Sequence, residues 1–482
     1  MKSNNSVISA IADNWQLDAM QENMCKYFFS DKDLSLVKDG KKCYVIGRKG
    51  AGKSAICQYL VNNPNYNQFA QKLTFKNFPF NELYSLSDPS YTKPNQYITL
   101  WKYLIYSTIC KLFVRNESID YEIRSDLENI YPQNSTKQLR REIKEWTGAD
   151  FELGIKDIHG KIGVQASQRV NSISWIDKVD ILEDLILTSC DNSTYYIVFD
   201  ELDEDYGTIK DAGELEYNYI PLLTSLFKAV QSVRSTFINS GFKIFPIVFL
   251  RDDIYAQIKD ADKNKWSDFK HNLEWNQVDI KNLLAYRISK EIATDDITFD
   301  AAWFKIFNKK NKITYGMDHS KVTDYFSFIS NSTYLRPRDF IKYIKCCCDE
   351  AIKRNARFID DRIIKDVDRE FSNYMINEIK DELYPILPDI DKILTIISNI
   401  RKLIFRPHEF ITEYNRAYKK GIVQEKNVDF ILETLFNFSV IGNQHRTIHS
   451  RHFFKYQHTN MTYNKDENIV IHRGLFKALQ LF

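Results

Sequence analysis

The chain has 482 residues, more than one hydrophobic core accommodates, so its length predicts two to four domains. Hydrophobic residues make up 44% and charged residues 27%, which is typical of a soluble globular protein. The net charge of +2 excludes a molecule that binds polyanions through its overall charge, so any basic surface is local. Only 15 glycines and 11 prolines are present, which predicts long helices and few long linkers.

Eight cysteines are scattered through the chain without a C-x-x-C pair. The adjacent Cys346, Cys347 and Cys348 suit neither a disulfide framework nor a zinc site, and we expect them to pack as small apolar residues. The first residues are polar, which predicts no signal peptide. No apolar run is long enough to span a bilayer. These features predict a cytoplasmic protein with reduced thiols and no membrane partner.

Helices and buried strands alternate along the first half of the chain. Apolar runs predict strands at residues 43–46, 73–80, 195–199 and 244–250, and alternating apolar positions predict a β-hairpin insert near residues 150–165. Amphipathic patterns predict helices over residues 6–29, 53–61, 97–113, 174–189 and 220–238. This alternation predicts an α/β fold, with a mostly parallel sheet covered by helices on both faces.

The turn between the first strand and its helix carries a phosphate-binding motif. Residues 47–54 read GRKGAGKS and match the G-x-x-x-x-G-K-[ST] pattern of a P-loop. Its glycines let the backbone take positive φ and approach an anion, while the loop amides and the helix N-terminus point partial positive charge into one concavity. A chance match in an ordinary strand–turn–helix is the alternative, and the full match in this context disfavours it.

The side chains of this loop suit a nucleoside triphosphate and Mg²⁺. Lys53 brings a compact ammonium to the β- and γ-phosphates, and the hydroxyl of Ser54 is an oxygen ligand of the kind that Mg²⁺ prefers. The residues expected to bind the nucleotide here are Gly47, Arg48, Lys49, Gly50, Ala51, Gly52, Lys53, Ser54 and Ala55.

A second motif ends the strand at residues 195–199. Four apolar residues are followed by Asp200 and Glu201, which matches a Walker B strand. At the carboxyl end of a central strand, Asp200 would hold Mg²⁺ through its water shell, and Glu201 would act as the general base toward the attacking water. The alternative is an acidic surface turn, because three more acidic residues follow at 203–205.

Arg251 follows the next buried strand directly. An arginine at this strand tip is suited to contact the γ-phosphate, where it would sense hydrolysis or stabilise transition-state charge. The alternative is an ion pair at the sheet rim with Asp252, Asp253 or Asp203. The sequence leaves both interpretations open, and we count Arg251 as a candidate catalytic residue beside Lys53 and Glu201.

From about residue 276 the patterns predict helices alone, which we interpret as an α-helical lid over residues 276–380. Pro337 is placed to begin one of these helices, between Arg336 and Arg338. Two arginines at the start of a lid helix are candidates to close over the nucleotide, as a sensor or as a finger offered to a neighbouring subunit. The alternative is solvated charge at a helix end.

Residues 381–482 follow the layout of a winged helix. Helices are expected over 390–401, 407–419 and 428–438, and short strands at 453–456, 461–464 and 468–471. Aromatic residues are interleaved with a set of basic ones, namely Arg446, Arg451, Lys455, Lys465, Arg473 and Lys477. This wing suits a phosphate backbone and hence DNA. A domain or subunit contact is the alternative, and the nearby histidines lack partners at metal-ligand spacing.

Over residues 18–351 these motifs resemble a group of bacterial P-loop ATPases on the AAA+/STAND side of the ASCE class. GRKGAGKSA, YIVFDELD, FLRDD, Leu273-Glu274-Trp275 with Arg287 downstream, and YLRPRDFI carry the resemblance. Such proteins tend to be encoded near phage-defence and mobile genes. The resemblance implies a five-stranded core sheet, the acidic pair at Asp200 and Glu201, an arginine sensor at Arg251, and a lid in which Arg336 or Arg338 senses nucleotide. STAND proteins often carry Asp-Asp where this chain carries Asp-Glu, which favours hydrolysis.

We therefore expect a P-loop ATPase core over residues 1–275 that includes the N-terminal helix, followed by the lid and the winged-helix-like domain. ATP rather than GTP rests on the resemblance, and no guanine-reading N-K-x-D motif appears. Three functions remain open: a defence or signalling ATPase with an effector partner and a homo-oligomeric assembly, a DNA-associated motor or loader, and a nucleotide-gated scaffold with little turnover.

Overall fold

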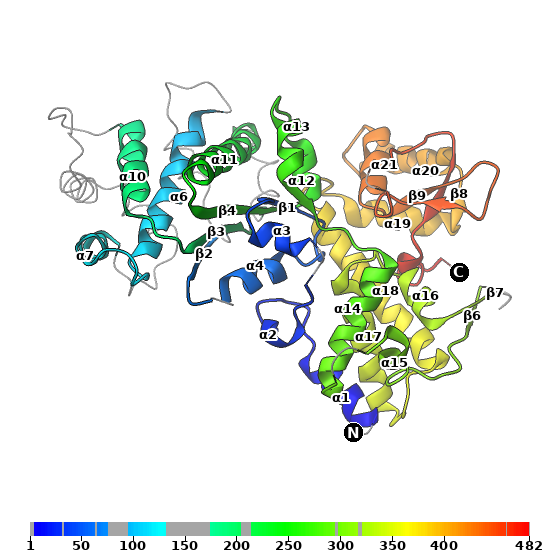
Figure 1. The fold of residues 1–482 in the computed structure, drawn as a ribbon. Coiled ribbons are helices and arrows are strands. Elements are labelled where there is room, and N and C mark those ends of the chain that lie inside the picture. Colours follow the sequence, from blue (N-terminus) through cyan, green and yellow to red (C-terminus); the bar gives the residue numbers. More distant parts are fainter. Residues whose placement is uncertain are drawn as a thin grey trace. The chain divides into compact units, whose positions relative to one another are not determined.

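The computed structural model divides the chain into two compact units. We call residues 30–274 the sheet unit, and residues 1–29 with 275–482 the helical unit, and we describe each by itself (Figure 1). The structure describes residues 4–30, 33–62, 65–75, 95–131, 174–203, 214–294, 297–316, 321–458 and 460–481.

A five-stranded parallel sheet forms the centre of the sheet unit. Its strands are β1 (Tyr44–Ile46), β2 (Gln68–Thr74), β3 (Thr194–Asp200), β4 (Lys243–Leu250) and β5 (Lys270–Asn272), in the spatial order β2-β3-β4-β1-β5. The strands β1, β3 and β4 are buried almost throughout, as expected of strands covered on both faces. Because all five run parallel, their carboxyl ends meet at one edge.

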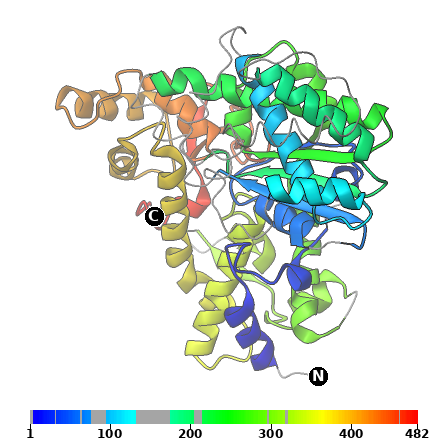
Figure 2. The ribbon, with the colours of Figure 1, turned by 90° about the vertical axis from the view of Figure 1, so that its left-hand side faces the viewer.

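Helices cover both faces of this sheet. The helix α4 packs on β2, β3 and β4 from one face, while α6 and α11 cover the other face (Figures 1 and 2). The helices of this unit are α3 (Leu34–Lys38), α4 (Lys53–Asn62), α6 (Ile98–Phe113), α7 (Tyr121–Ile130), α10 (Trp175–Ser189), α11 (Glu214–Asn239), α12 (Asp252–Gln257) and α13 (Lys263–Trp266), with 3₁₀ turns η1 (Asn95–Tyr97) and η4 (Ser267–Phe269). The buried Trp101 of α6 donates its indole N–H to the carbonyl of Leu222 at 2.9 Å, which joins α6 to α11.

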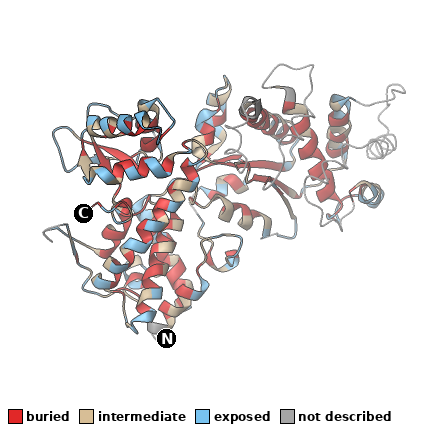
Figure 3. Ribbon diagram, turned by 180° about the vertical axis from the view of Figure 1, so that it is seen from behind, coloured by how far each residue is buried: buried red, intermediate tan, exposed pale blue. Residues whose placement is uncertain are grey.

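The helical unit has one continuous hydrophobic core. Its helices are α1 (Asn4–Asn14), α2 (Met24–Tyr27), α14 (Gln277–Ile292), α15 (Phe299–Trp303), α16 (Tyr325–Ser330), α17 (Pro337–Lys353), α18 (Asp361–Leu383), α19 (Ile390–Ile400), α20 (Pro407–Lys419), α21 (Val428–Asn437) and the 3₁₀ turn η5 (Arg473–Leu475). Buried residues line the inner faces of these helices while the outer faces are exposed (Figure 3). The thiols of Cys346, Cys347 and Cys348 are buried in α17, as expected.

Two small antiparallel sheets complete the helical unit. The strands β6 (Ile313–Tyr315) and β7 (Lys321–Thr323) form one pair. The strands β8 (Ile404–Phe405), β9 (Ile441–Gln444), β10 (His452–Phe453) and β11 (Asn468–Ile471) form a sheet in the order β10-β9-β11-β8. We call residues 390–481, with α19, α20, α21 and this sheet, the C-terminal module. Among the described residues, no helix combines the length and apolarity that a bilayer span requires.

The N-terminal segment differs from the single helix expected over residues 6–29. It forms α1 and α2, and α1 packs against α14 and α17 within the helical unit. Charge complementarity explains this, because the ammonium of Lys345 donates to the carbonyls of Ala12 at 2.6 Å and Trp15 at 2.9 Å, where α1 ends. The buried guanidinium of Arg287 pairs with Glu22, and Lys26 pairs with Glu291 at 2.9 Å.

Several strands also differ from expectation. The strand expected at 73–80 overlaps the end of β2, which starts at Gln68, and residues 76–80 lie outside the described residues. The strand expected at 461–464 does not form, and the sequence patterns do not predict β5, β6, β7, β8 or β9. The cause is similar for β2 and β5, which lie at the edges of their sheet and mix polar with apolar residues, so no apolar run marks them. The β-hairpin expected near residues 150–165 lies outside the described residues.

Candidate nucleotide-binding site

The P-loop begins where β1 ends and closes at the first turn of α4. Two of its glycines have left-handed backbone conformations, with φ of +78° at Gly50 and +106° at Gly52. Side-chain-bearing residues rarely adopt such angles, so the glycines at these two positions fix the path of the loop. A Cβ on Gly47 would lie 3.0 Å from the Cβ of Leu273, which leaves little room for a larger residue. The first amides of α4 have no intrahelical acceptors and suit an anion at this place.

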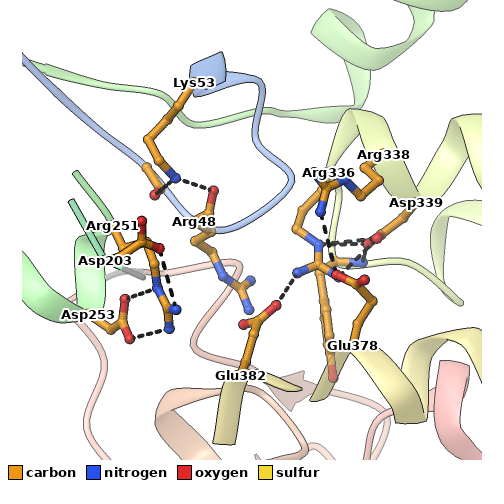
Figure 4. Close-up of polar contacts among 12 residues, drawn as sticks. Arg48, Lys53, Asp203, Arg251, Asp253, Arg336, Arg338, Asp339, Glu378 and Glu382 are labelled. Atoms are coloured by element: carbon orange, nitrogen blue, oxygen red, sulfur yellow. Dashed lines mark hydrogen bonds and ion pairs between the residues drawn. The ribbon is translucent and has the colours of Figure 1, made fainter. Parts of the chain in front are cut away.

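Lys53 stands at the start of α4 and folds over the loop. Its ammonium donates to the carbonyl of Gly47 at 2.8 Å and to that of Arg48 at 3.0 Å (Figure 4). Burial lowers the pKa of Lys53, and the charges of Asp203 and Asp252 partly offset that effect. The ammonium is therefore held inside the loop, where burial disfavours its charge and the nearby carboxylates only partly offset this. Ser54 follows it and is half-buried.

The acidic pair lies at the same edge of the sheet. Asp200 is the last residue of β3 and is only 3% exposed. Glu201 comes next, with a φ of +58°. A left-handed conformation at a residue with a side chain costs about 1–3 kcal/mol and persists only where surrounding contacts impose it. Here the hydroxyl of Thr74, on β2, donates to the Glu201 carboxylate and helps hold it.

Lys72, two residues before Thr74 on β2, completes this cluster. Its ammonium lies 2.9 Å from Oδ2 of Asp200 and 3.7 Å from Oε2 of Glu201. Burial alone would lower the pKa of Lys72, but the neighbouring Asp200 and Glu201 raise it. The apolar pattern predicts a strand only from residue 73, five residues after β2 begins, and so does not single out Lys72 or Thr74 as site residues. The available signal was their spacing of two residues, which puts both on one face of a strand.

The residues at this edge fit a Mg²⁺–triphosphate. A carboxylate as buried as that of Asp200 requires a cation beside it, and the Lys72 ammonium occupies that role on one side. Oxygen ligands from Asp200 and Ser54, near a lysine and a ring of loop amides, match the preferences of Mg²⁺ and phosphate. The charge of Asp200 acts on Lys53, so the two groups belong to one site.

Arg251 directly follows β4 and forms ion pairs at this edge. Its Nε and Nη2 donate to the two carboxylate oxygens of Asp253 at 3.0 and 2.7 Å, and its Nη1 lies 3.6 Å from Oδ2 of Asp203 (Figure 4). These are the rim contacts that the sequence left open as an alternative. The contact of Arg251 with a γ-phosphate stays a prediction.

Asp252 was considered only as a partner of Arg251, and the structure gives it a different environment. Burial raises the pKa of Asp252, and the guanidinium of Arg48 lowers it in part. Its charge also acts on Lys53. Asp252 therefore faces the P-loop, whereas Asp253 binds Arg251.

The two candidate arginines of the helical unit have different environments. The guanidinium of Arg336 is 3% exposed and donates to Asp339 with Nη2 at 2.9 Å and to Glu382 with Nη1 at 3.0 Å (Figure 4). It thereby ties the start of α17 to the end of α18. The side chain of Arg338 is 31% exposed, and its Nη1 lies 3.7 Å from Oε2 of Glu378. Nucleotide sensing by either residue stays a prediction, and Arg338 is the more accessible.

One family model matches part of the helical unit. Residues 278–380 match the FunZ-associated C-terminal helical domain, a segment that spans α14 to α18 except for the last residues of α18. No sequence among curated proteins matches the chain significantly.

A search of solved structures finds origin-recognition proteins at low sequence identity. The Aeropyrum pernix ORC2 protein in ADPNP–ADP complexes is 10% identical, with a TM-score of 0.40, over 93% of this chain and 91% of that chain. Drosophila ORC bound to DNA is 10% identical, with a TM-score of 0.31, over 99% and 92%. The Aeropyrum pernix ORC1 protein in complex with DNA is 7% identical, with a TM-score of 0.36, over 99% and 96%.

The environments of Arg336 and Arg338 lead to a test by paired substitutions. We expect Arg336→Met to lower the free energy of unfolding by about 3–5 kcal/mol, because it leaves two buried carboxylates without their cation. Arg338→Met, which loses a partly exposed ion pair, should cost less than about 1 kcal/mol. Urea denaturation of the full chain, followed by tryptophan fluorescence, measures both. Equal effects of the two substitutions would contradict a structural role for the Arg336 ion pairs.

Proposed function

We propose that the protein is a Mg²⁺-dependent ATPase whose nucleotide state controls its helical unit. The observation that carries this proposal is the gathering of Lys53, Asp200 and Glu201 at one edge of a parallel sheet, next to a P-loop with two left-handed glycines. A parallel sheet binds ligands at the carboxyl ends of its strands, and this edge carries both an anion-binding loop and acidic groups. ATP rather than GTP follows from the family resemblance.

Some residues of the site bind the nucleotide and the metal, and another accepts the proton of the attacking water. The loop amides and the Lys53 ammonium bind the β- and γ-phosphates, while Asp200 and Ser54 hold the metal. Bound Mg²⁺ would neutralise charge that develops on the phosphate oxygens. Glu201 orients a water molecule toward the γ-phosphate and accepts its proton. The hydroxyl of Thr74 donates to the Glu201 carboxylate and helps to orient it.

The biological setting rests on the family resemblance. We propose a bacterial defence or signalling ATPase of the AAA+/STAND type, which acts in the cytoplasm, where thiols such as those of α17 stay reduced. Nucleotide would bias the position of the helical unit and so alter contacts with an effector protein or with further copies of the chain. A nucleotide-gated scaffold with little turnover is distinguished from this ATPase by its rate of hydrolysis.

Two substitutions separate binding from hydrolysis. Lys53→Ala removes the ammonium in the P-loop and should abolish ATP binding, as measured by calorimetry. Glu201→Gln keeps the shape of the side chain but loses the base, so it should bind ATP and lower kcat by about 100-fold or more.

Lys243→Ala is the matched control, because this exposed lysine lies at the start of β4, at the amino end of the strand. It should leave binding and kcat unchanged. Normal hydrolysis by Glu201→Gln would exclude Glu201 as the base, and no hydrolysis by the wild-type chain would favour the scaffold.

A second candidate function, association with double-stranded DNA, is favoured by the charge on the surface of the helical unit. Arg446 and Arg451 are exposed in the segment that joins β9 to β10 of the C-terminal module. Lys321 of β7 is also exposed, and its charge helps to lower the pKa of His452 in β10, after burial as the main cause. Basic groups of the C-terminal module and of the β6–β7 pair therefore lie near one another in the helical unit. Such groups are suited to a phosphate backbone, and we propose that the C-terminal module is a winged helix.

The DNA proposal is tested by its dependence on salt. If Arg451 and Lys321 each contact a phosphate, the double variant Arg451→Ala/Lys321→Ala should lower affinity and reduce the slope of log K against log salt by about 2. Fluorescence anisotropy with a labelled duplex at several salt concentrations measures both. The control is Lys41→Ala/Lys243→Ala, two exposed lysines of the sheet unit, which should keep the wild-type slope. Identical slopes for all three proteins would exclude this surface as the DNA site.

A further inference from the structure

Lys72 places a positive charge directly against the residues that we assign to metal binding and hydrolysis. In the parallel register of β2 and β3, Lys72 is opposite Val198 and Thr74 is opposite Asp200. Lys72 and Thr74 are two residues apart, so both side chains leave the same face of β2. Each of them contacts a carboxylate of the acidic pair, because Lys72 reaches Asp200 and Thr74 reaches Glu201.

The contact between Lys72 and the acidic pair is largely shielded from solvent. The side chain of Lys72 is 14% exposed, and those of Asp200 and Glu201 are 5% and 25% exposed. Among the described residues, the thiol of Cys57, from α4, also faces Lys72, and burial raises the pKa of this thiol. The two carboxylates and one ammonium therefore carry a net charge of −1, in surroundings where charges interact strongly.

We propose that Lys72 is a built-in counter-ion that competes with Mg²⁺ for Asp200, and so sets the Mg²⁺ concentration at which the site retains nucleotide. This inference rests on the proposed ATPase function and adds to it a positioning residue with a regulatory effect. A divalent cation held by Asp200 must overcome the repulsion of an ammonium 2.9 Å from one oxygen of that carboxylate. Removing the ammonium should therefore tighten metal binding.

The place of β2 in the sheet argues against Lys72 as a phosphate ligand. Two strands, β3 and β4, separate β2 from β1, whose end carries the P-loop. Neighbouring strands lie about 4.8 Å apart, so the backbone of β2 is roughly 14 Å from that of β1. The Lys72 side chain is also directed at Asp200, on the adjacent strand. Its charge consequently acts on the metal ligand more directly than on the phosphates.

The test measures nucleotide retention as a function of Mg²⁺, independently of turnover. The full chain is titrated with Mg²⁺ in the presence of a fluorescent, non-hydrolysable ATP analogue. We expect Lys72→Met to lower the half-saturating Mg²⁺ concentration by about tenfold. The free energy that corresponds to this change is only a small part of the Coulomb energy between unit charges at this distance. Lys72→Arg keeps the charge and should stay near the wild-type value. Lys243→Met, which removes an exposed charge at the other end of a strand, should behave as the wild type.

Lys72→Gln provides the same test in a protein that keeps a hydrogen-bond donor beside Asp200. Lys72→Met leaves a buried carboxylate without its cation, which destabilises the fold, whereas the amide of glutamine partly replaces the lost partner. Circular dichroism checks that both variants are folded. A shift of the Mg²⁺ midpoint with Lys72→Gln, in the direction given above, supports the proposal, and an unchanged or raised midpoint overturns it.

A parallel titration without metal separates the remaining outcomes. With EDTA present, Lys72→Gln and the wild type should bind the analogue equally. Weaker binding by the variant under these conditions would identify Lys72 as a phosphate ligand and overturn the counter-ion role. If the wild-type chain shows no binding of the analogue at any Mg²⁺ concentration, the proposed ATPase function itself fails, whatever Lys72 does.

Discussion

The structure of the candidate site depends on one constraint, the burial of Asp200 at the end of β3. A carboxylate that is 3% exposed is stable in its charged form only beside cations or strong donors. In this site Lys72, on the neighbouring strand, supplies the cation. The negative charge of Asp200 also acts on the ammonium of Lys53 in the P-loop. The parallel sheet makes this possible, because it brings the ends of β1, β3 and β4 to one edge, although they are far apart in sequence.

In the helical unit, too, buried charged side chains lie beside groups of opposite charge. Arg336 is buried with Asp339 and Glu382, and these groups join α17 to α18 in a fully paired network. Arg287 and Glu22 do the same between α14 and the N-terminal segment. In the helical unit these charges join helices within the fold. At the end of β3 one ammonium likewise faces two carboxylates, but this group lies at the edge where a parallel sheet binds ligands, the edge that also carries the P-loop.

The sequence predicted the features that are local and missed those that depend on tertiary neighbours. The P-loop with its flanking strand and helix, and the buried strands β3 and β4, follow from short patterns that the core reinforces. Among the described strands, β2 and β5 are each hydrogen-bonded to one neighbouring strand, and they mix polar with apolar residues, so no continuous apolar run marks them. The sequence predicts a helix over residues 6–29 and groups it with the P-loop core, but the position of this segment depends on Lys345 and Arg287, more than 250 residues away. The hydrophobic periodicity of a segment does not indicate contacts with residues so distant in the sequence.

The role of Lys72 and Thr74 follows from this difference between central and edge strands. Both residues of the acidic pair are contacted from β2, which among the described strands is hydrogen-bonded only to β3. An edge strand loses fewer hydrogen bonds when it shifts than a central strand does, so it is the least costly part of the sheet to displace. A shift of β2 would move the Lys72 ammonium and the Thr74 hydroxyl together, and would change their contacts with Asp200 and Glu201 in one step. A strand that sequence patterns delimit poorly thus supplies contacts to both carboxylates.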